Sequence, residues 1–313
     1  MLRVAYLGPE GTFAEQAARA FAEAGTGLGA ATDHELVPVD SVPEVLAAVR
    51  AGRAEAGCVP IENSVEGAVP ATMDSLAEDE PLIAVAETVL SVRFSVLVRP
   101  GARADQVRTV ASHPHALAQV RLWLAEHLPN AKAAASTSTA AAAVAVLDGD
   151  FDAAVTAPVA AVHYPLQVLA TDVADLTDAV TRFLLLRTPT RPPEPTGADR
   201  TSAIFVTADR PGELATILTE FSLRGINLSR IESRPMKGRL GAYRFYLDFD
   251  GHVLEPRVGD ALSALHRRSS QVRFLGSYPK ADQQASPAPP STTDADYTEA
   301  ATWLDELRGG SGA

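Results

Sequence analysis

Residues 4–13 read Val-Ala-Tyr-Leu-Gly-Pro-Glu-Gly-Thr-Phe and decide how the chain begins to fold. A short apolar run is followed by a turn that contains glycine and proline, which is typical of a strand ending at Leu7. The next stretch places apolar side chains on one helical stripe, at Phe13, Ala17, Ala20, Phe21 and Ala24. This order of strand, turn and helix predicts an α/β unit.

A second helix and strand follow in the same half of the unit. Ser41 precedes a predicted helix over residues 42–51, and Gly52 follows that helix. Serine is a favoured N-cap residue and glycine a favoured C-cap residue, so both helix ends are marked. A predicted strand at residues 56–59 then leads into the polar cluster Pro-Ile-Glu-Asn-Ser at residues 60–64.

The same pattern of elements returns later in the chain. A predicted strand at residues 107–111 leads into Ser-His-Pro-His at residues 112–115 and then into a predicted helix over residues 116–128. An alanine-rich helix and a strand at residues 153–156 follow. The repetition indicates two lobes of similar architecture.

The spacing within the two halves also agrees. Ser41 and Gly52 are eleven positions apart, and so are Ser138 and Gly149. An acid stands three positions after each glycine, at Glu55 and Asp152. Duplication of one α/β unit is the simplest interpretation, and chance similarity between alanine-rich segments is the alternative.

Three polar segments follow predicted strands in these lobes. Ligands of α/β sheets bind outside the carboxyl ends of the strands, where helix N-termini offer unpaired N–H groups. We therefore expect residues 8–12, 62–64 and 112–115 to surround one cleft between the lobes.

The composition excludes several classes of protein. The chain has 313 residues, of which 46% are hydrophobic and 21% charged, as expected for a folded protein of about two domains. Its net charge of -12 argues against a nucleic-acid partner and against an anionic membrane surface, because both require clustered Lys and Arg. No apolar run approaches the length of a membrane span or of a signal peptide, and the single cysteine, Cys58, cannot form an internal disulfide. These features predict a cytoplasmic location.

The charge is distributed unevenly along the chain. Residues 1–199 hold 13 Lys/Arg against 25 Asp/Glu, residues 200–280 hold 13 against 8, and residues 281–313 hold 1 against 6. Composition predicts a catalytic or binding domain over residues 3–188, a proline-rich linker over 189–200, a second domain over 201–280 and an acidic, disordered tail over 281–313. Within that tail, residues 300–307 could form a helical turn that docks through Trp303.

Several common catalytic motifs are missing from the sequence. It contains no zinc-hydrolase, P-loop or dinucleotide-binding motif and no nucleophile elbow. His113 and His115 could be metal ligands or bases, although beside Pro114 they more simply shape the start of a helix. The remaining hydroxyls, amides and Arg182 suit the binding of a small anion, so we expect no metal and no cofactor.

Four segments, in this order, closely resemble the motifs of the prephenate dehydratase family. They are residues 8–13 (Gly-Pro-Glu-Gly-Thr-Phe), 60–67 (Pro-Ile-Glu-Asn-Ser-Val-Glu-Gly), 112–117 (Ser-His-Pro-His-Ala-Leu) and 181–183 (Thr-Arg-Phe). The resemblance implies a two-lobed, periplasmic-binding-protein-like α/β catalytic domain. It also implies a hydro-lyase that converts prephenate to phenylpyruvate, water and carbon dioxide in phenylalanine biosynthesis, without a cofactor.

The same resemblance implies a set of catalytic residues. Activity would depend on Thr181, whose hydroxyl would hydrogen-bond the departing oxygen. Arg182 would hold a substrate carboxylate, and Phe183 would form the pocket wall. Substrate-binding residues would be Thr12, Glu62, Asn63, Ser64, Ser112 and Gln119. The family usually has Gln where this chain has His115, which leaves the role of that residue open.

Residues 201–280 have the order β-α-β-β-α-β of a ferredoxin-like unit. This small fold often pairs its sheet edge with a second copy.

Residues 224–228 (Arg-Gly-Ile-Asn-Leu) and 231–235 (Ile-Glu-Ser-Arg-Pro) resemble the ACT ligand-binding domain. The resemblance implies a homodimer or homotetramer with an allosteric L-phenylalanine site at a subunit interface. That site would contain Gly212, Glu213, Leu214, Ala215, Asn227, Leu228, Glu232, Ser233, Arg234 and Pro235. A purely structural dimerisation domain is the alternative.

Other functions stay open at this point. A non-catalytic two-lobed binding protein would share the cleft but would not need the Thr-Arg-Phe cluster at residues 181–183. Arogenate could replace prephenate as the substrate, and the sequence does not discriminate between them. A fused chorismate mutase is not expected, because the chain starts directly with its first predicted strand.

Overall fold

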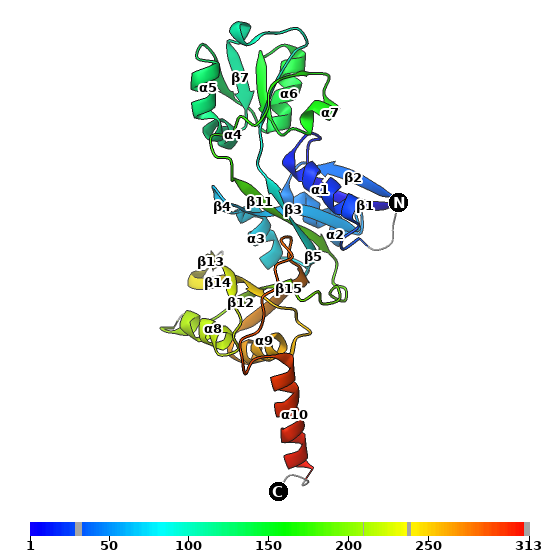
Figure 1. Ribbon diagram of the computed structural model, residues 1–313, viewed down its shortest axis with the longest axis vertical. Coiled ribbons are helices and arrows are strands. Elements are labelled where there is room, and N and C mark those ends of the chain that lie inside the picture. The colour runs from blue at the N-terminus through cyan, green and yellow to red at the C-terminus, as the bar shows by residue number, and fades with distance from the viewer. Residues whose placement is uncertain (29–32, 209, 237–238, 310–313) are drawn as a thin grey trace. The chain divides into compact units, whose positions relative to one another are not determined.

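The computed structural model describes residues 1–28, 33–208, 210–236 and 239–309. The chain forms two compact units (Figure 1). Unit 1 comprises Met1–Ser75 and Thr88–Thr188, and unit 2 comprises Leu76–Glu87 and Pro189–Ala313. Among the helices within the described ranges, none is both long enough and apolar enough to cross a membrane.

The first lobe of unit 1 is built on one mixed sheet. Its strands lie in the order β2-β1-β3-β11-β5, with β4 paired to β3. The elements are β1 (Leu2–Leu7), α1 (Phe13–Ala24), β2 (His34–Val39), α2 (Val42–Arg50), β3 (Ala56–Asn63), β4 (Gly67–Ala68), α3 (Pro70–Ala77), β5 (Ile83–Ser91) and β11 (Val180–Arg187). The strand β5 begins in unit 2 and ends in unit 1.

The second lobe has a sheet of its own, in the order β10-β6-β9-β7-β8. Its elements are β6 (Ser95–Val98), a 3-10 turn (Ala104–Gln106), β7 (Thr109–Ser112), α4 (Pro114–Gln119), α5 (Arg121–His127), β8 (Lys132–Ala135), α6 (Thr139–Asp148), β9 (Ala153–Thr156), α7 (Ala160–His163) and β10 (Gln167–Ala170). The predicted single helix over 116–128 is therefore two helices, because the backbone leaves the helical region at Val120.

The two lobes repeat one topology, which confirms the prediction of two lobes of similar architecture. In each lobe one strand lies between two parallel partners, β2 and β3 beside β1, and β8 and β9 beside β7. An antiparallel strand then joins the third, β11 in one lobe and β6 in the other. The predicted α/β fold class with two lobes is confirmed.

The predicted N-caps of the repeated helices are also confirmed. The Ser41 side chain accepts a hydrogen bond from the N–H of Glu44, and the Ser138 side chain accepts one from the N–H of Ala141. Gly149 ends α6 with a φ of 88°, a left-handed conformation that glycine adopts without a steric cost.

Unit 2 contains the predicted ferredoxin-like fold. Its elements are β12 (Asp199–Val206), α8 (Glu213–Ser222), β13 (Leu228–Met236), β14 (Arg239–Asp250), α9 (Pro256–Arg268), β15 (Gln271–Pro279) and α10 (Asp294–Arg308). The four antiparallel strands lie in the order β13-β14-β12-β15. Apolar side chains of α8 and α9, including Phe221 and Leu265, pack on one face of this sheet around Phe205 and Phe249.

Unit 2 also contains a segment that the sequence prediction placed in the first domain, Leu76–Glu87. The guanidinium of Arg200 donates to both carboxylate oxygens of Glu87 at 2.7 and 2.6 Å, and the Ala281 N–H donates to the same carboxylate. Arg273 donates to the backbone carbonyls of Leu76 and Glu78. These long-range contacts group the segment with the second domain, although the local sequence carries no signal for them.

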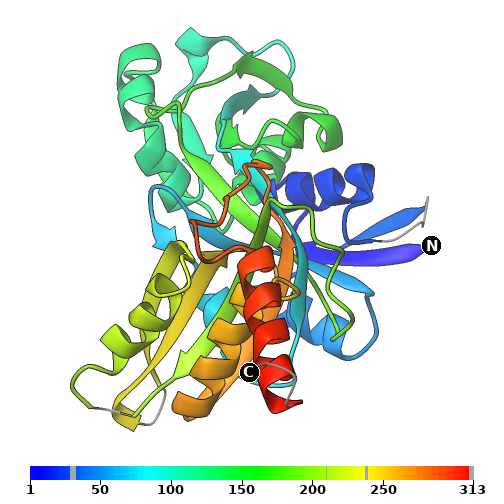
Figure 2. The same ribbon diagram turned by 60° about the horizontal axis from the view of Figure 1, so that its bottom comes forward.

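The tail differs from the predicted disorder, because Asp294–Arg308 forms the helix α10, which starts beside α9 (Figure 2). A capping box starts the helix: Thr293 and Asp296 exchange side chain to backbone hydrogen bonds. Trp303 is 59% exposed, so it does not provide the docking contact that the sequence suggested. Residues 310–313 of the predicted tail lie outside the described residues.

Candidate functional site

Unit 1 contains a cavity of about 380 Å³ at the carboxyl ends of its parallel strands. Both lobes line it. The lining residues are Leu7, Gly8, Thr12, Phe13, Ala14, Asp40, Pro60, Asn63, Glu66, Val92, Phe94, His113, His115, Ala116, Gln119, Thr137, Ser138, Thr139, Thr181 and Phe183. Five of the nine residues predicted to be catalytic or substrate-binding are among them, namely Thr12, Asn63, Gln119, Thr181 and Phe183.

Thr181 and Asn63 form the central polar pair of this cavity. They face each other on the antiparallel strands β11 and β3, and the amide nitrogen of Asn63 donates to Oγ1 of Thr181 at 2.8 Å. The Asn63 carbonyl oxygen accepts from the N–H groups of Val65 and Glu66, which fixes the orientation of the amide. Because the threonine oxygen is an acceptor here, its O–H is the group that can be donated into the cavity.

Arg182 lies on the opposite face of the same strand. Successive side chains of a strand point to opposite faces, so Thr181 and Arg182 cannot both point into the cavity. Arg182 is 7% exposed, and its Nε lies 3.5 Å from the carboxylate of Glu62, its neighbour across the strands. Neither of these two side chains lines the cavity. Phe183 does, after a register shift that follows Arg182.

Two further predicted donors make hydrogen bonds within the protein. The hydroxyl of Ser64 accepts from the Val180 N–H at 2.9 Å. Ser112 is fully buried, and its hydroxyl donates to the Val155 carbonyl at 2.6 Å. Neither residue lines the cavity, so the structure leaves them beside the site rather than in it.

Thr12 enters the cavity from the loop that precedes α1. As the N-cap of that helix, its hydroxyl accepts from the Glu15 N–H and donates to the Leu7 carbonyl at 3.2 Å. Gly11 before it has a φ of 85°, and a Cβ atom there would lie 2.9 Å from the ring of Tyr164. The second lobe therefore packs directly against this loop.

The buried carboxylate of Glu15 joins the two lobes beneath the same loop. It accepts hydrogen bonds from the Gly11 N–H at 2.6 Å and from Nε of Arg19 at 2.7 Å, and it contacts Nε2 of His163, from α7 of the second lobe, at 2.8 Å. Burial alone would raise the pKa of Glu15, but these hydrogen bonds outweigh burial and hold it below the usual value of 4.5.

The second lobe contributes imidazoles and an amide to the cavity. His113 is the N-cap of α4, where its Nδ1 accepts from the His115 N–H, and burial together with nearby His115 lowers its pKa. His115 forms an ion pair with Glu66 of the first lobe. The side-chain oxygen of Gln119 is buried and has no hydrogen-bond partner among the described residues. Asp40, Glu66 and residues 137–139 also line the cavity but were not predicted as site residues. Asp40 and residues 137–139 lie at the starts of the helices predicted after Ser41 and Ser138, and Glu66 lies within the motif at residues 60–67.

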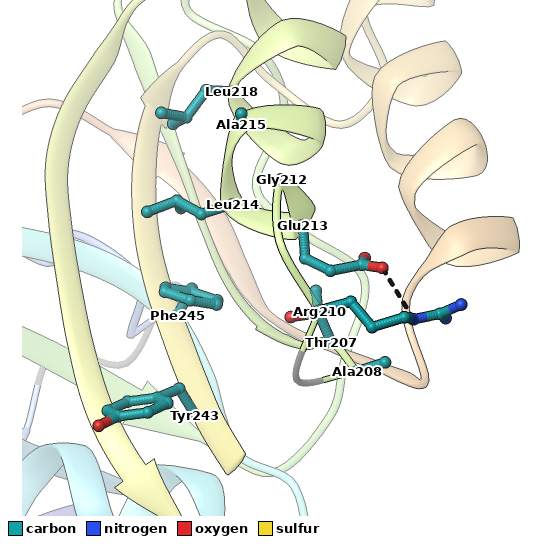
Figure 3. Close-up of a pocket in the computed structure, with 10 residues that line it drawn as sticks. All are labelled: Thr207, Ala208, Arg210, Gly212, Glu213, Leu214, Ala215, Leu218, Tyr243 and Phe245. Carbon is teal, nitrogen blue, oxygen red and sulfur yellow. Dashed lines mark ion pairs between the residues drawn. The ribbon is translucent and has the colours of Figure 1, made fainter. Parts of the chain in front are cut away.

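Unit 2 has a second pocket, between α8 and β14, also of about 380 Å³ (Figure 3). The residues that line it are Thr207, Ala208, Arg210, Gly212, Glu213, Leu214, Ala215, Leu218, Tyr243 and Phe245. Leu214 and Leu218 extend from the helix towards the strand that carries Tyr243 and Phe245, and Arg210 pairs with Glu213 at 3.3 Å. The wall is therefore largely apolar and lies next to a helix N-terminus.

Four of the ten residues predicted for the allosteric site line this pocket, namely Gly212, Glu213, Leu214 and Ala215. The other six lie elsewhere in unit 2. Asn227 donates to the carboxylate of Asp250, Leu228 packs against the core, and residues 232–235 are on the edge strand β13. One chain alone therefore does not bring the ten residues together.

Comparison with known proteins agrees with this architecture. The family model of prephenate dehydratase matches residues 4–191, more than half of the chain. The chain belongs to the prephenate dehydratase family. The ACT domain model matches residues 201–267, which fall within unit 2.

Relatives within the prephenate dehydratase family are similar over nearly the whole chain. The prephenate dehydratase of Amycolatopsis methanolica is 58% identical over 99% of this chain and 99% of its own length. A solved prephenate dehydratase of Arthrobacter aurescens in complex with L-Phe is 44% identical, with a TM-score of 0.91 over 98% of this chain and 100% of that one. GqqA, described as a novel type of quorum quenching acylase, is 31% identical, with a TM-score of 0.78 over 91% of this chain and 98% of that one.

Proposed function

We propose that this protein converts prephenate to phenylpyruvate, water and carbon dioxide in the cavity of unit 1, as a step of L-phenylalanine biosynthesis. The observation that carries the proposal is the hydrogen-bonded pair Asn63 and Thr181 at the centre of the cavity of a prephenate dehydratase family member. The higher identity to the Arthrobacter dehydratase than to the acylase GqqA favours this activity.

The chemistry requires few catalytic groups. Loss of the ring carboxylate together with the ring hydroxyl makes the ring aromatic, so the reaction is downhill and needs neither a metal nor a nucleotide. Thr181 would donate a hydrogen bond from its O–H to the departing oxygen, directly or through a water. An alcohol is too weak an acid to protonate this oxygen, so the proton that completes the product water would come from solvent. The amide of Asn63 holds the threonine oxygen in place, so the donor is oriented before substrate binds.

The apolar side of the cavity supports the decarboxylation. Phe13 and Phe94 pack edge to face with ring centres 5.5 Å apart, and Val92 and Phe183 complete this wall. A carboxylate held against such a wall is poorly hydrated, which favours its loss as neutral carbon dioxide.

The polar contacts to substrate are part of the same proposal. Asn63, Gln119 and the loop at Thr12 can reach a ligand in the cavity as they stand. Substrate binding stays a prediction for four other residues, because each would have to exchange a partner within the protein for the substrate. These residues are Glu62, Ser64, Ser112 and Arg182. A carboxylate clamp at Arg182 would require its side chain to leave the buried face of β11.

Incubation of the purified protein with prephenate, read by phenylpyruvate absorbance, tests the proposed reaction. We expect turnover without added metal or nucleotide. A parallel incubation with arogenate, in which an amino group replaces the side-chain keto group, distinguishes the two substrates. Binding of prephenate without formation of phenylpyruvate would instead favour a non-catalytic two-lobed binding protein.

The pocket of unit 2 is the proposed site of feedback regulation by L-phenylalanine. The N-terminus of α8 at Gly212 can receive the carboxylate of an amino acid, and Leu214, Leu218 and Phe245 offer an apolar surface for its ring. The predicted residues on β13 would then come from a second copy of the chain, in a homodimer or homotetramer.

Isothermal titration with L-phenylalanine, combined with sedimentation velocity, tests this regulation. We expect saturable binding that lowers dehydratase activity, and an oligomer at the concentrations used. Leu218→Ala should weaken binding, and Leu223→Ala, an exposed leucine one residue beyond the same helix, should not. An absence of binding by any aromatic amino acid would favour a purely structural dimerisation domain.

A cytoplasmic location is also proposed. Cys58 is buried and forms no disulfide, so the protein has no need of an oxidising compartment.

A further inference from the structure

The cavity of unit 1 holds few side chains that could neutralise an anion. Among its described lining residues, His113 and His115 are the only ones that can carry a positive charge. Asp40 and Glu66 line the same cavity as acids. Prephenate carries two carboxylates, and Arg182 points to the other face of its strand. Apart from the N–H groups of helix N-termini, positive charge for such a substrate would therefore come from the imidazoles or from a rearrangement of the sheet.

His115 is the better placed of the two imidazoles. Its side chain is 58% exposed and pairs across the cavity with Glu66, which is 38% exposed and follows β3 in the first lobe. The pair therefore spans the two lobes at an accessible part of the lining. The ring of His113 lies 4.9 Å from that of His115, and burial and the nearby imidazole favour its uncharged form.

We propose that His115 binds a carboxylate of the substrate, which replaces the carboxylate of Glu66 as its partner, and that His113 donates a hydrogen bond beside it. This inference rests on the proposed dehydratase function. Exchange of one carboxylate for another leaves the number of ion pairs unchanged, so the imidazolium is never left without a counter-charge. Glu66 moves back towards solvent, where its charge is hydrated.

The proposal predicts a change in the Michaelis constant and not in the chemical step. His115→Gln should raise KM for prephenate about tenfold or more and change kcat little, because a charge-assisted contact is lost while the Asn63 and Thr181 pair is untouched. His115→Arg, which keeps a positive charge, should stay near the wild-type KM. The groups that face His115 are Glu66, His113 and Asp40.

His127→Gln is the matched control, because His127 belongs to the same lobe, stacks on Trp123 and does not line the cavity. It should leave KM and kcat unchanged. Two results would overturn the role of His115. One is an active wild type with the same KM as His115→Gln, and the other is a KM for His115→Arg that is raised as much as that of His115→Gln. A wild type that forms no phenylpyruvate would overturn the proposed function itself, and with it this inference.

Discussion

The two lobes of unit 1 share a topology but bring different chemistry to the cavity between them. Each places one strand between two parallel neighbours, β1 in one lobe and β7 in the other, and each caps an equivalent helix with a serine, Ser41 and Ser138. At the strand ends the similarity stops. The first lobe supplies the Asn63 and Thr181 pair, whereas the second supplies His113, His115 and Gln119.

This difference shows which features two lobes of one topology share, the helix caps and the strand pairing, and which can differ, the side chains at the strand ends. Caps and parallel pairing fix the backbone, so both copies retain them. Side chains beyond the carboxyl ends of the strands contribute little to the core and can diverge. A hydroxyl donor from one lobe and imidazoles from the other then suit a substrate that must lose a hydroxyl and carries two carboxylates.

The largest expected effect tests the contribution of the first lobe. Thr181→Ala removes the O–H proposed to assist departure of the hydroxyl, and removal of one such donor typically lowers kcat by about 10²- to 10³-fold. Asn63→Ala should have a similar effect, and the double variant should be little worse, because the two side chains act as one unit. Steady-state kinetics with prephenate measures all three.

Thr177→Ala controls for removal of a threonine from this part of the chain, since Thr177 is exposed and does not line the cavity. It should retain wild-type kcat. If Thr181→Ala also retained it, the first lobe would not supply the chemistry, and the imidazoles of the second would have to be considered instead.

The second prediction concerns a buried contact that joins the two lobes. Glu15→Gln weakens a buried carboxylate that binds Gly11, Arg19 and His163, and we expect a loss of about 1.5 to 3 kcal/mol in the free energy of unfolding at neutral pH. Urea denaturation at pH 7 measures it. Glu23→Gln, an exposed acid on the same helix, should cost almost nothing.

The same variant predicts a pH dependence. The pKa of Glu15 is lower in the folded protein than its usual value of 4.5, so its stabilisation is complete above about pH 4.5 and is lost as the pH falls through the folded-state pKa. The stability difference between wild type and Glu15→Gln should therefore shrink below pH 4.5. A constant difference from pH 7 to pH 3 would show that Glu15 does not act through its charge.

Features that depend on the local sequence pattern could be predicted from the sequence. Ser41 and Ser138 are N-caps as their positions indicated, and Thr181, which the family motif implied, lines the cavity because side chains alternate along β11. Alternation also determines that Arg182 faces away from Thr181. The predicted carboxylate clamp at Arg182 therefore requires this side chain to leave that face of the strand.

Other features depend on partners that are distant in the chain. The hydroxyl of Ser112 donates to Val155 because β9 lies beside β7, and no pattern near residue 112 reveals that neighbour. The grouping of residues 76–87 with unit 2 likewise depends on Arg200 and Arg273, more than one hundred positions away. Fold class follows from periodicity, whereas the orientation of single side chains follows from tertiary packing.

The third prediction tests the two faces of β11. Glu62→Gln weakens the pairing of Arg182 on the face turned away from the cavity, so it should lower the free energy of unfolding by about 0.5 to 1 kcal/mol, since Glu62 is partly exposed. If Glu62 and Arg182 stay paired on that face when substrate binds, KM for prephenate should not change. Thermal unfolding and steady-state kinetics on the same preparation separate the two effects, and a raised KM with unchanged stability would return Arg182 to the substrate site.

The smallest expected effect compares the acids that the duplication placed at equivalent positions. Glu55 accepts from the N–H of Arg3 at the start of β1, and Asp152 accepts from the N–H groups of Arg108 and Thr109 and from the hydroxyl of Thr109, at the start of β7.

Because Asp152 accepts three hydrogen bonds and Glu55 one in these contacts, Asp152→Asn should destabilise the protein more than Glu55→Gln does. The loss for Asp152→Asn should be at most about 0.5 kcal/mol, because its side chain is 36% exposed. In both cases the pKa of the acid is below its usual value, lowered for Glu55 by the backbone hydrogen bond from Arg3 and for Asp152 by hydrogen bonds that outweigh burial. Both losses should therefore be smaller in acid, when the carboxylates are protonated. Urea denaturation at pH 7 and pH 3 measures the loss of unfolding free energy in both variants. A greater loss for Glu55→Gln than for Asp152→Asn would mean that the two acids stabilise their lobes in different ways.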